Sequence, residues 1–337
     1  MPTEPSKIVL NKYLDPLPTD FTWTRDDNSN NHQEMRLLEV EYGFKFCAVT
    51  GSFNFLVNTS TRVMFAVRKC CKFMYMPGRP HFKALKHLLY HIWCHPPGAL
   101  KFYCDVTTSP LAKMIKEAGH EGIDPSFCGF TDSSWHDCDN GRSTGCYMHF
   151  LQGGLINMNS FVPPPIAMSS AESENNTLCV GTMTGIHLTK IIMELCFRNP
   201  HRPYTLPIFV DSAAAITING NDKDTKLTRH TERCWQFTRQ AQHRGDVQTY
   251  HANGDDYQLV DAGTKNLRAS AYKHKMAIME VPLELNGDFK SKRGDGARAE
   301  ETRPARSNDL DLFESLTTKD RPMTSVRQTF EFLCKVA

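Results

Sequence analysis

Phe127-Cys128-Gly129-Phe130-Thr131-Asp132 is an apolar run that ends in a carboxylate, and the expected fold is built outward from it. A short apolar run of this kind, bounded by turn signals, predicts a buried β-strand. An acid at the end of such a strand is, taken alone, most often a turn or capping residue. Asp132 becomes a candidate functional residue only if other carboxylates converge on it.

The residues after this strand carry alternating strand and helix signals. Gln152-Gly153-Gly154 is typical of a hairpin turn between two strands. The elements expected in chain order are strands at 146–151 and 155–161, a helix at 171–195, a strand at 206–210, a helix at 231–243, a strand at 247–251 and a short helix after 258. This order predicts an α/β domain with a mixed sheet.

Upstream of the first strand the apolar residues have helical spacing. They recur at three- and four-residue steps from Gly51 to Cys94, interrupted by Pro77-Gly78-Arg79-Pro80, which predicts a helical hairpin. Residues 15–35 are rich in Pro, Asp, Asn and Thr and predict a loop. The expected organisation is a linker at 1–40, a helical segment at 41–125, an α/β domain at 126–270 and a tail at 271–337 that is partly disordered with a C-terminal helix.

Composition is that of a soluble globular protein, with 40% apolar and 23% charged residues in a chain of 337. No apolar run approaches the roughly 18 residues that cross a bilayer, and the N-terminus lacks the layout of a signal peptide. We therefore expect a cytoplasmic or nuclear protein that is neither secreted nor bound to a membrane. The 12 cysteines are then expected to be reduced. His91-Ile92-Trp93-Cys94-His95 is a weak zinc candidate, because it lacks a second regular ligand pair.

Basic side chains gather between Lys223 and Arg244, although the net charge of the whole chain is only +2. Such a stripe suits a phosphate backbone, and it equally suits a solvated helix face.

Three further acids occupy positions comparable to that of Asp132. Glu174 lies near the start of the helix predicted at 171–195, and Asp211 directly follows the strand predicted at 206–210. Asp261 comes late in the same region, just before a Gly-Thr-Lys sequence. Singly, each of these acids is a capping or surface residue. Together, at the ends of neighbouring elements, they could hold a pair of hard divalent cations, because Mg²⁺ prefers oxygen ligands.

Sequence blocks around these acids resemble a known family. The blocks are Gly129–Trp135, Gly141–Tyr147, Met168–Glu174, Ile208–Ile216 and Gln258–Lys265. In order and approximate spacing they resemble the ribonuclease H domain of copia-type LTR retrotransposon polyproteins. Gly51–Thr59 and Met74-Tyr75-Met76-Pro77 are similar to the end of the reverse transcriptase that precedes that domain, so the resemblance covers about residues 40 to 268. No Tyr-x-Asp-Asp motif occurs, and the polymerase core would lie before residue 1.

The resemblance implies a ribonuclease H-like fold, with a mixed five-stranded sheet and flanking helices preceded by a small helical segment. It implies endonucleolytic hydrolysis of RNA in RNA–DNA hybrids by two Mg²⁺ ions, with Mn²⁺ as a substitute, within a Pol polyprotein. Other Pol or Gag proteins of the element are further expected partners, and virus-like particles in the cytoplasm, or the nucleus, the expected location.

The resemblance also assigns roles to residues. Asp132 would bridge both ions, Glu174 and Asp211 would complete the shell of one, and Asp261 that of the other. The residues expected to contact the hybrid are Ser133, Arg142, Ser143, Thr144, Ser212, Arg229, His230 and Lys265.

Some alternatives stay open at this stage. Glu172 competes with Glu174, but two residues apart on a helix their side chains point about 200° apart, so only one faces the metals. Asp255 and Asp256 compete with Asp261. Cys234 stands where the family has Arg. Such departures concern residues outside the predicted metal ligands, and they support a second hypothesis, an inactive relic that binds nucleic acid or a protein partner.

Overall fold

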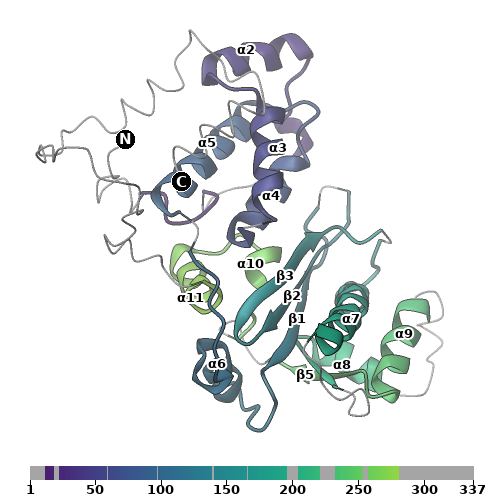
Figure 1. Cartoon of the computed structure of the whole chain (residues 1–337). Coiled ribbons are helices and arrows are strands. Elements are labelled where there is room, and N and C mark those ends of the chain that lie inside the picture. The colour runs from purple at the N-terminus through teal and green to yellow at the C-terminus, as the bar shows by residue number, and fades with distance from the viewer. Residues whose placement is uncertain are drawn as a thin grey trace, which may run out of the picture.

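The computed structural model describes residues 12–18, 23–58, 60–96, 98–138, 140–164, 166–195, 204–220, 232–252 and 257–280. Its first part is a helical unit, drawn at the top of Figure 1. The unit comprises η1 (Arg25–Asp27), α2 (His32–Tyr42), α3 (Phe46–Leu56), η2 (Thr61–Val63), α4 (Met64–Cys71) and α5 (Arg79–Cys94). The Asn31 side chain caps the start of α2, and Gly43, at a φ of 75°, ends it. Phe46 and Phe82 pack edge-to-face inside the unit and join α3 to α5.

The second part is an α/β domain around one mixed sheet. After η3 (Val106–Thr108) and α6 (Pro110–Glu117) it comprises β1 (Phe127–Ser134), β2 (Thr144–Leu151), β3 (Gly154–Phe161), α7 (Ser170–Leu195), β4 (Leu206–Val210), α8 (Ala213–Gly220), α9 (Glu232–His243), β5 (Val247–His251), α10 (Asp261–Thr264) and α11 (Ala269–Met279). The strand order is β3-β2-β1-β4-β5. β1, β2 and β3 pair antiparallel, whereas β4 pairs parallel with both β1 and β5.

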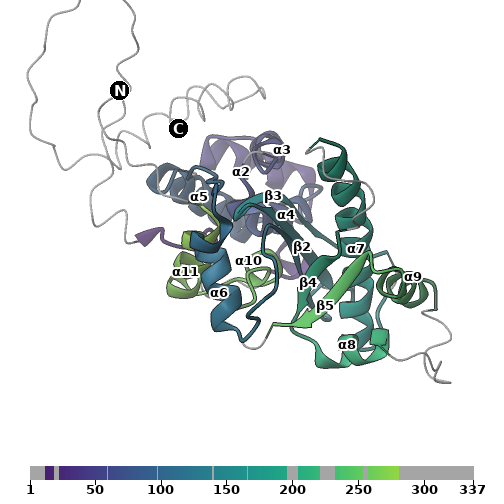
Figure 2. The same cartoon turned by 60° about the horizontal axis from the view of Figure 1, so that its bottom comes forward.

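Helices cover both faces of this sheet (Figure 2). Side chains alternate along β1, so Phe127 joins the core under α7, α8 and α9, while Cys128 and Phe130 join the opposite core with α10, α11 and the helical unit. The helical unit is therefore packed onto the α/β domain through a shared apolar core, and it places α4 beside the edge strand β3.

Close packing of α7 on the sheet depends on glycine. A Cβ atom added at Gly181 would lie 2.6 Å from Thr131 Cγ2, closer than real contacts allow. α7 is also long and apolar enough to cross a membrane by length and composition, contrary to the expectation that no segment would be. The central helix of a globular fold passes the same test, and α7 packs here on β1, β2 and β4.

The predicted fold class, an α/β domain with a mixed five-stranded sheet, flanking helices and a preceding helical segment, is confirmed. The expected boundaries differ in places. α2 begins at His32, inside the loop predicted for 15–35, and crosses the boundary placed at 40. α11 crosses the boundary placed at 270, because its buried Tyr272 and Met276 belong to the core. The helices α6 and α8 were not expected, and residues 281–337 of the predicted tail, with its C-terminal helix, lie outside the described residues.

Candidate metal centre

Strand pairing brings two of the acids together at one edge of the sheet. β1 and β4 are parallel neighbours, with Thr131 opposite Val210. Asp132 directly follows Thr131, and Asp211 directly follows Val210, so the two acids lie side by side. Glu174 approaches from the first turns of α7, which crosses the sheet above β1.

Asp132, Glu174 and Asp211 form one cluster, called here the acidic triad. Each offers a carboxylate oxygen, and these oxygens all lie within 4.8 Å of one another. Asp132 and Glu174 are buried, with 1% and 6% of their surface exposed, while Asp211 is partly buried. Three carboxylates from three elements at this separation could hold a divalent metal ion. This is the metal-compatible cluster of His, Cys, Asp and Glu side chains found among the described residues.

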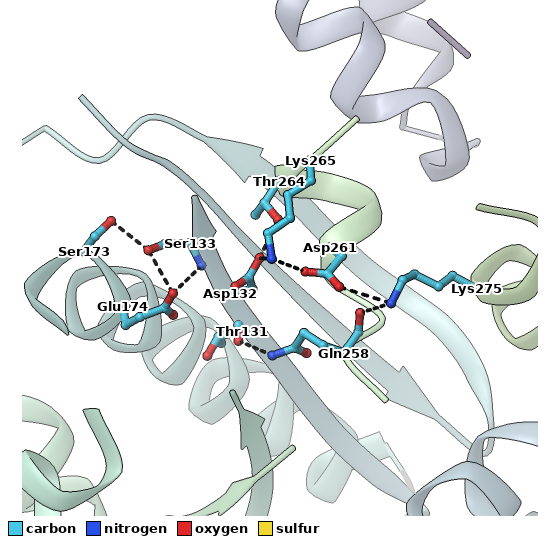
Figure 3. A network of polar contacts seen from close by, with 10 residues as sticks. All are labelled: Thr131, Asp132, Ser133, Ser173, Glu174, Gln258, Asp261, Thr264, Lys265 and Lys275. Carbon is cyan, nitrogen blue, oxygen red and sulfur yellow. Dashed lines mark hydrogen bonds and ion pairs between the residues drawn. The ribbon is translucent and has the colours of Figure 1, made fainter. Parts of the chain in front are cut away.

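Hydrogen bonds from β1 fix the orientation of Glu174 (Figure 3). Its Oε1 accepts from the Ser133 backbone N–H at 3.1 Å and from Ser133 Oγ at 3.2 Å. Ser133 Oγ lies 2.7 Å from Ser173 Oγ, which completes a short chain of hydroxyl groups. Glu174 Oε2 is buried and has no hydrogen-bond partner among the described residues. A buried, unsatisfied carboxylate oxygen is costly unless a cation or donor binds it.

Burial and mutual repulsion disfavour the charged forms of these acids. Burial raises the pKa of Asp132 to about 7. The positive charge of Lys265 lowers this pKa in part, and the negative charge of Asp211 raises it further. Burial and the charges of Asp132 and Asp211 raise the pKa of Glu174 well above its ordinary value. Burial also raises the pKa of Asp211. A divalent cation bound between the carboxylates would relieve this repulsion. Raised pKa values in a cluster of acids are therefore typical of metal-ligand sites.

Asp261 lies beside the triad but is paired differently. Its Oδ1 is 2.7 Å from Lys265 Nζ, and its Oδ2 is 3.2 Å from Lys275 Nζ. Lys265 Nζ also lies 3.9 Å from Asp132 Oδ2, and the Thr264 hydroxyl donates to the same oxygen of Asp132. The fourth predicted ligand is therefore connected to the triad through a lysine, as Figure 3 shows.

Of the rival acids, only Glu172 lies within the described residues. Glu172 Oε2 accepts from the Met168 backbone N–H at 2.8 Å, so this carboxylate is engaged at the start of α7, away from the triad. Asp255, Asp256, Arg229 and His230 lie outside the described residues. His91, in the weak zinc candidate, is buried and bonds through Nδ1 to the Tyr13 carbonyl at 3.0 Å.

The other residues expected to contact substrate have local partners. Ser212 Oγ accepts from the Ala215 N–H and caps α8, and Ser143 Oγ accepts from the His136 N–H. Thr144 Oγ1 donates to Asp137 Oδ2 at 2.7 Å. Arg142 and Lys265 line a cavity of about 710 Å³. The triad carboxylates do not line it, but Thr264 and Lys265 in its wall both contact Asp132.

Sequence reasoning missed several residues around the site. The cavity has a second wall, from the helical unit, formed by Trp23, Asn28, Phe65, Lys69, Lys72 and Phe73. Lys275, on α11, was also missed. Lys69 lies in the last turn of α4 and Lys72 is the C-cap residue three positions further on, and this spacing is a signal that could have identified them as a basic patch.

The chain thus has an α/β fold of the ribonuclease H-like kind, with an acidic triad at one edge of its sheet. No protein-family model matches the chain. It is 23% identical over 247 residues to the retrovirus-related Pol polyprotein from transposon RE2 of Arabidopsis thaliana, which covers 72% of the chain. It is 24% identical over 242 residues to that from transposon RE1 of the same plant, covering 71%. It is 25% identical over 189 residues to that from transposon TNT 1-94 of Nicotiana tabacum, covering 55%.

These relatives are retrovirus-related Pol polyproteins of plant transposons, and they are similar to this chain at low identity. The chain spans only 16%, 15% and 12% of their respective lengths.

Proposed function

We propose that this chain is the part of a copia-type retrotransposon Pol polyprotein that cleaves RNA within RNA–DNA hybrids, using Mg²⁺ bound by Asp132, Glu174 and Asp211. The observation that carries the proposal is the convergence of these three carboxylates, from β1, α7 and the end of β4, within 4.8 Å. The proposal places the protein on an RNA–DNA hybrid, with other Pol or Gag proteins as neighbours in a virus-like particle or in the nucleus.

The triad supplies what phosphodiester hydrolysis needs. A divalent ion held there would neutralise charge on the scissile phosphate and lower the pKa of a bound water. Ser133 holds Glu174 toward the other two acids through two hydrogen bonds, so the ligand set is oriented before any ion binds. Thr264 positions the Asp132 carboxylate in the same way.

The cavity beside the triad suits a nucleic-acid strand. Lys69, Lys72, Arg142 and Lys265 contribute positive charge to its wall. Lys69 pairs with Asp137 at 2.9 Å, Lys72 donates to Cys138 Sγ at 2.9 Å and Lys265 pairs with Asp261 at 2.7 Å. In this proposal these ammonium groups and the Arg142 guanidinium would contact the phosphate backbone of the strand. Selection of RNA over DNA would depend on contacts to the 2′-hydroxyl group.

The direct test is cleavage of a synthetic RNA–DNA hybrid by the purified chain, with the label on the RNA strand in one arm and on the DNA strand in the other. We expect Mg²⁺-dependent cutting of the RNA strand alone, none in EDTA, and none of duplex DNA or single-stranded RNA. Cutting of either strand without metal, or of duplex DNA at a similar rate, contradicts the proposal.

A second candidate function is nucleic-acid binding without catalysis. The pairing of Asp261 with two lysines favours it, since this acid is then not free as a ligand. It predicts that the chain binds the hybrid with an affinity that falls steeply as salt rises, and that no strand is cut at any Mg²⁺ concentration.

A further inference from the structure

Both oxygens of the Asp261 carboxylate are occupied by ammonium groups from this chain. Lys265 Nζ lies 2.7 Å from Oδ1 and Lys275 Nζ lies 3.2 Å from Oδ2. Lys275 is buried, with a side chain only 3% exposed, and it also donates to the Gln258 carbonyl at 2.6 Å. Breaking such a buried pair by removing one partner leaves an uncompensated charge, so Asp261 is held firmly in its pairing.

The Lys265 ammonium extends this pairing to the triad. Its Nζ lies 2.7 Å from Asp261 Oδ1 and 3.9 Å from Asp132 Oδ2, so one positive charge stands between the two acids. A metal ion that used both acids as ligands would have to occupy the same space. Lys265 is 43% exposed along its side chain, and its head group is nevertheless directed inward (Figure 3).

The triad differs from Asp261 in how its carboxylate oxygens are paired. Glu174 is 6% exposed, and its Oε2 has no hydrogen-bond partner among the described residues. The same carboxylate contributes an oxygen to the cluster whose ligand atoms lie within 4.8 Å of one another. The site thus contains a triad with one unpaired carboxylate oxygen and, beside it, a carboxylate whose two oxygens are both paired with ammonium groups.

We infer that this site takes a single divalent cation, on Asp132, Glu174 and Asp211, and that the Lys265 ammonium, held by Asp261, stands in place of a second. This narrows the two-ion expectation for the chain, and it rests on the proposed function for the role of the site. An ammonium group carries three N–H donors, so Lys265 would contact a phosphate oxygen where a second ion would otherwise bind.

The test is a titration of the whole chain with Mn²⁺ in the absence of nucleic acid. The EPR signal of free Mn²⁺ measures how many ions each chain binds. Wild type should bind one Mn²⁺ per chain, and Asp132→Asn should abolish that binding. Lys265→Met removes the ammonium and keeps the apolar stem, so it should raise the stoichiometry to two. Lys275→Met should also raise the number of bound ions. If this substitution of a buried residue prevents folding, the stoichiometry of Lys265→Met alone tests the inference.

Lys273→Met is the matched control, because Lys273 is an exposed lysine on the same helix as Lys275, and it should bind one ion. Two ions in wild type, both lost in Asp132→Asn, overturn the inference, and so does a single ion in Lys265→Met. Since the readout is metal stoichiometry, an absence of hybrid cleavage with one bound Mn²⁺ refutes the proposed function and leaves this inference standing.

Discussion

The backbone N–H of Ser133 on β1 donates to Glu174 Oε1 on α7 at 3.1 Å. The Ser133 hydroxyl bonds to the same oxygen at 3.2 Å, so one residue of the sheet fixes the rotation of the first turns of the helix. Glu174 is directed toward Asp132 and Asp211 for this reason, and Glu172 is engaged elsewhere.

Ser133→Ala removes the hydroxyl contact and keeps the backbone one. Side chains that orient metal ligands change metal affinity by about 10- to 100-fold when they are lost, and we expect the lower end of that range here because one bond remains. The measurement is the Mn²⁺ concentration at half saturation. Ser133→Thr keeps a hydroxyl group and should restore most of the affinity; equal affinity in wild type and Ser133→Ala argues against an orienting role.

Gly181→Ala tests the close packing of α7 on the sheet. The added Cβ would lie 2.6 Å from Thr131 Cγ2 and 3.2 Å from Tyr147 Cβ. Overpacking of this kind costs about 1–3 kcal/mol, which outweighs the gain of up to about 1 kcal/mol from replacing a helical glycine. Urea denaturation should therefore show a lower free energy of unfolding.

Gly51→Ala is the control for that substitution. Gly51 lies in α3 with no atom within 4 Å of the added Cβ. The same change should raise the free energy of unfolding there, by about 0.5–1 kcal/mol. A stabilised Gly181→Ala variant would contradict the packing described for α7.

Acid should weaken the fold through His149, which lies between β2 and α7. Burial, partly opposed by its hydrogen bond to the Gly181 carbonyl, lowers the pKa of His149 from 6.5 to about 4. Above pH 6.5 the ring is neutral in both states, and its contribution to stability is complete. As pH falls from 6.5 toward 4 the unfolded chain binds a proton that the folded chain refuses, so stability falls, by about 3 kcal/mol in total.

His149→Gln removes the titrating ring and isolates this contribution from that of the acids. Urea unfolding of both proteins at several pH values should show a wild-type stability that falls more steeply between pH 6.5 and 4. Parallel curves for the two proteins would mean that the folded state protonates His149 as easily as the unfolded chain does.

The sequence predicted well those features that are local along the chain. Apolar runs predict the strands near residues 127, 206 and 247, and apolar residues at helical spacing over a long stretch predict helix α7. Helix α6 could have been found, because Ser109 followed by Pro110 is a start signal and the Ser109 side chain caps the Ala112 N–H.

Other features depend on contacts between distant segments. α8 has only eight residues and is stabilised by packing against α7 and α9 rather than by its own propensity. Lys275 carries no motif, and its role arises only when α11 folds back toward Asp261. The acidic triad was predictable because each member adjoins a recognisable element. Lys265 was named as a substrate contact and lies four residues after Asp261, whereas the second ammonium group that pairs with Asp261, that of Lys275, was not predictable.

The pair Glu174→Gln and Glu172→Gln tests the central claim most directly. In each variant the amide oxygen can still accept the backbone N–H that the carboxylate accepts now, from Ser133 or Met168, so the fold is expected to persist. Cleavage of the RNA strand of a hybrid in Mg²⁺ is the measurement. We predict that Glu174→Gln loses activity by on the order of 100-fold or more, since a metal ligand should cost at least as much as its supporting residues. Glu172→Gln should cut at close to the wild-type rate; equal rates in the two variants, whether both high or both low, would contradict the assignment of Glu174 to the metal centre.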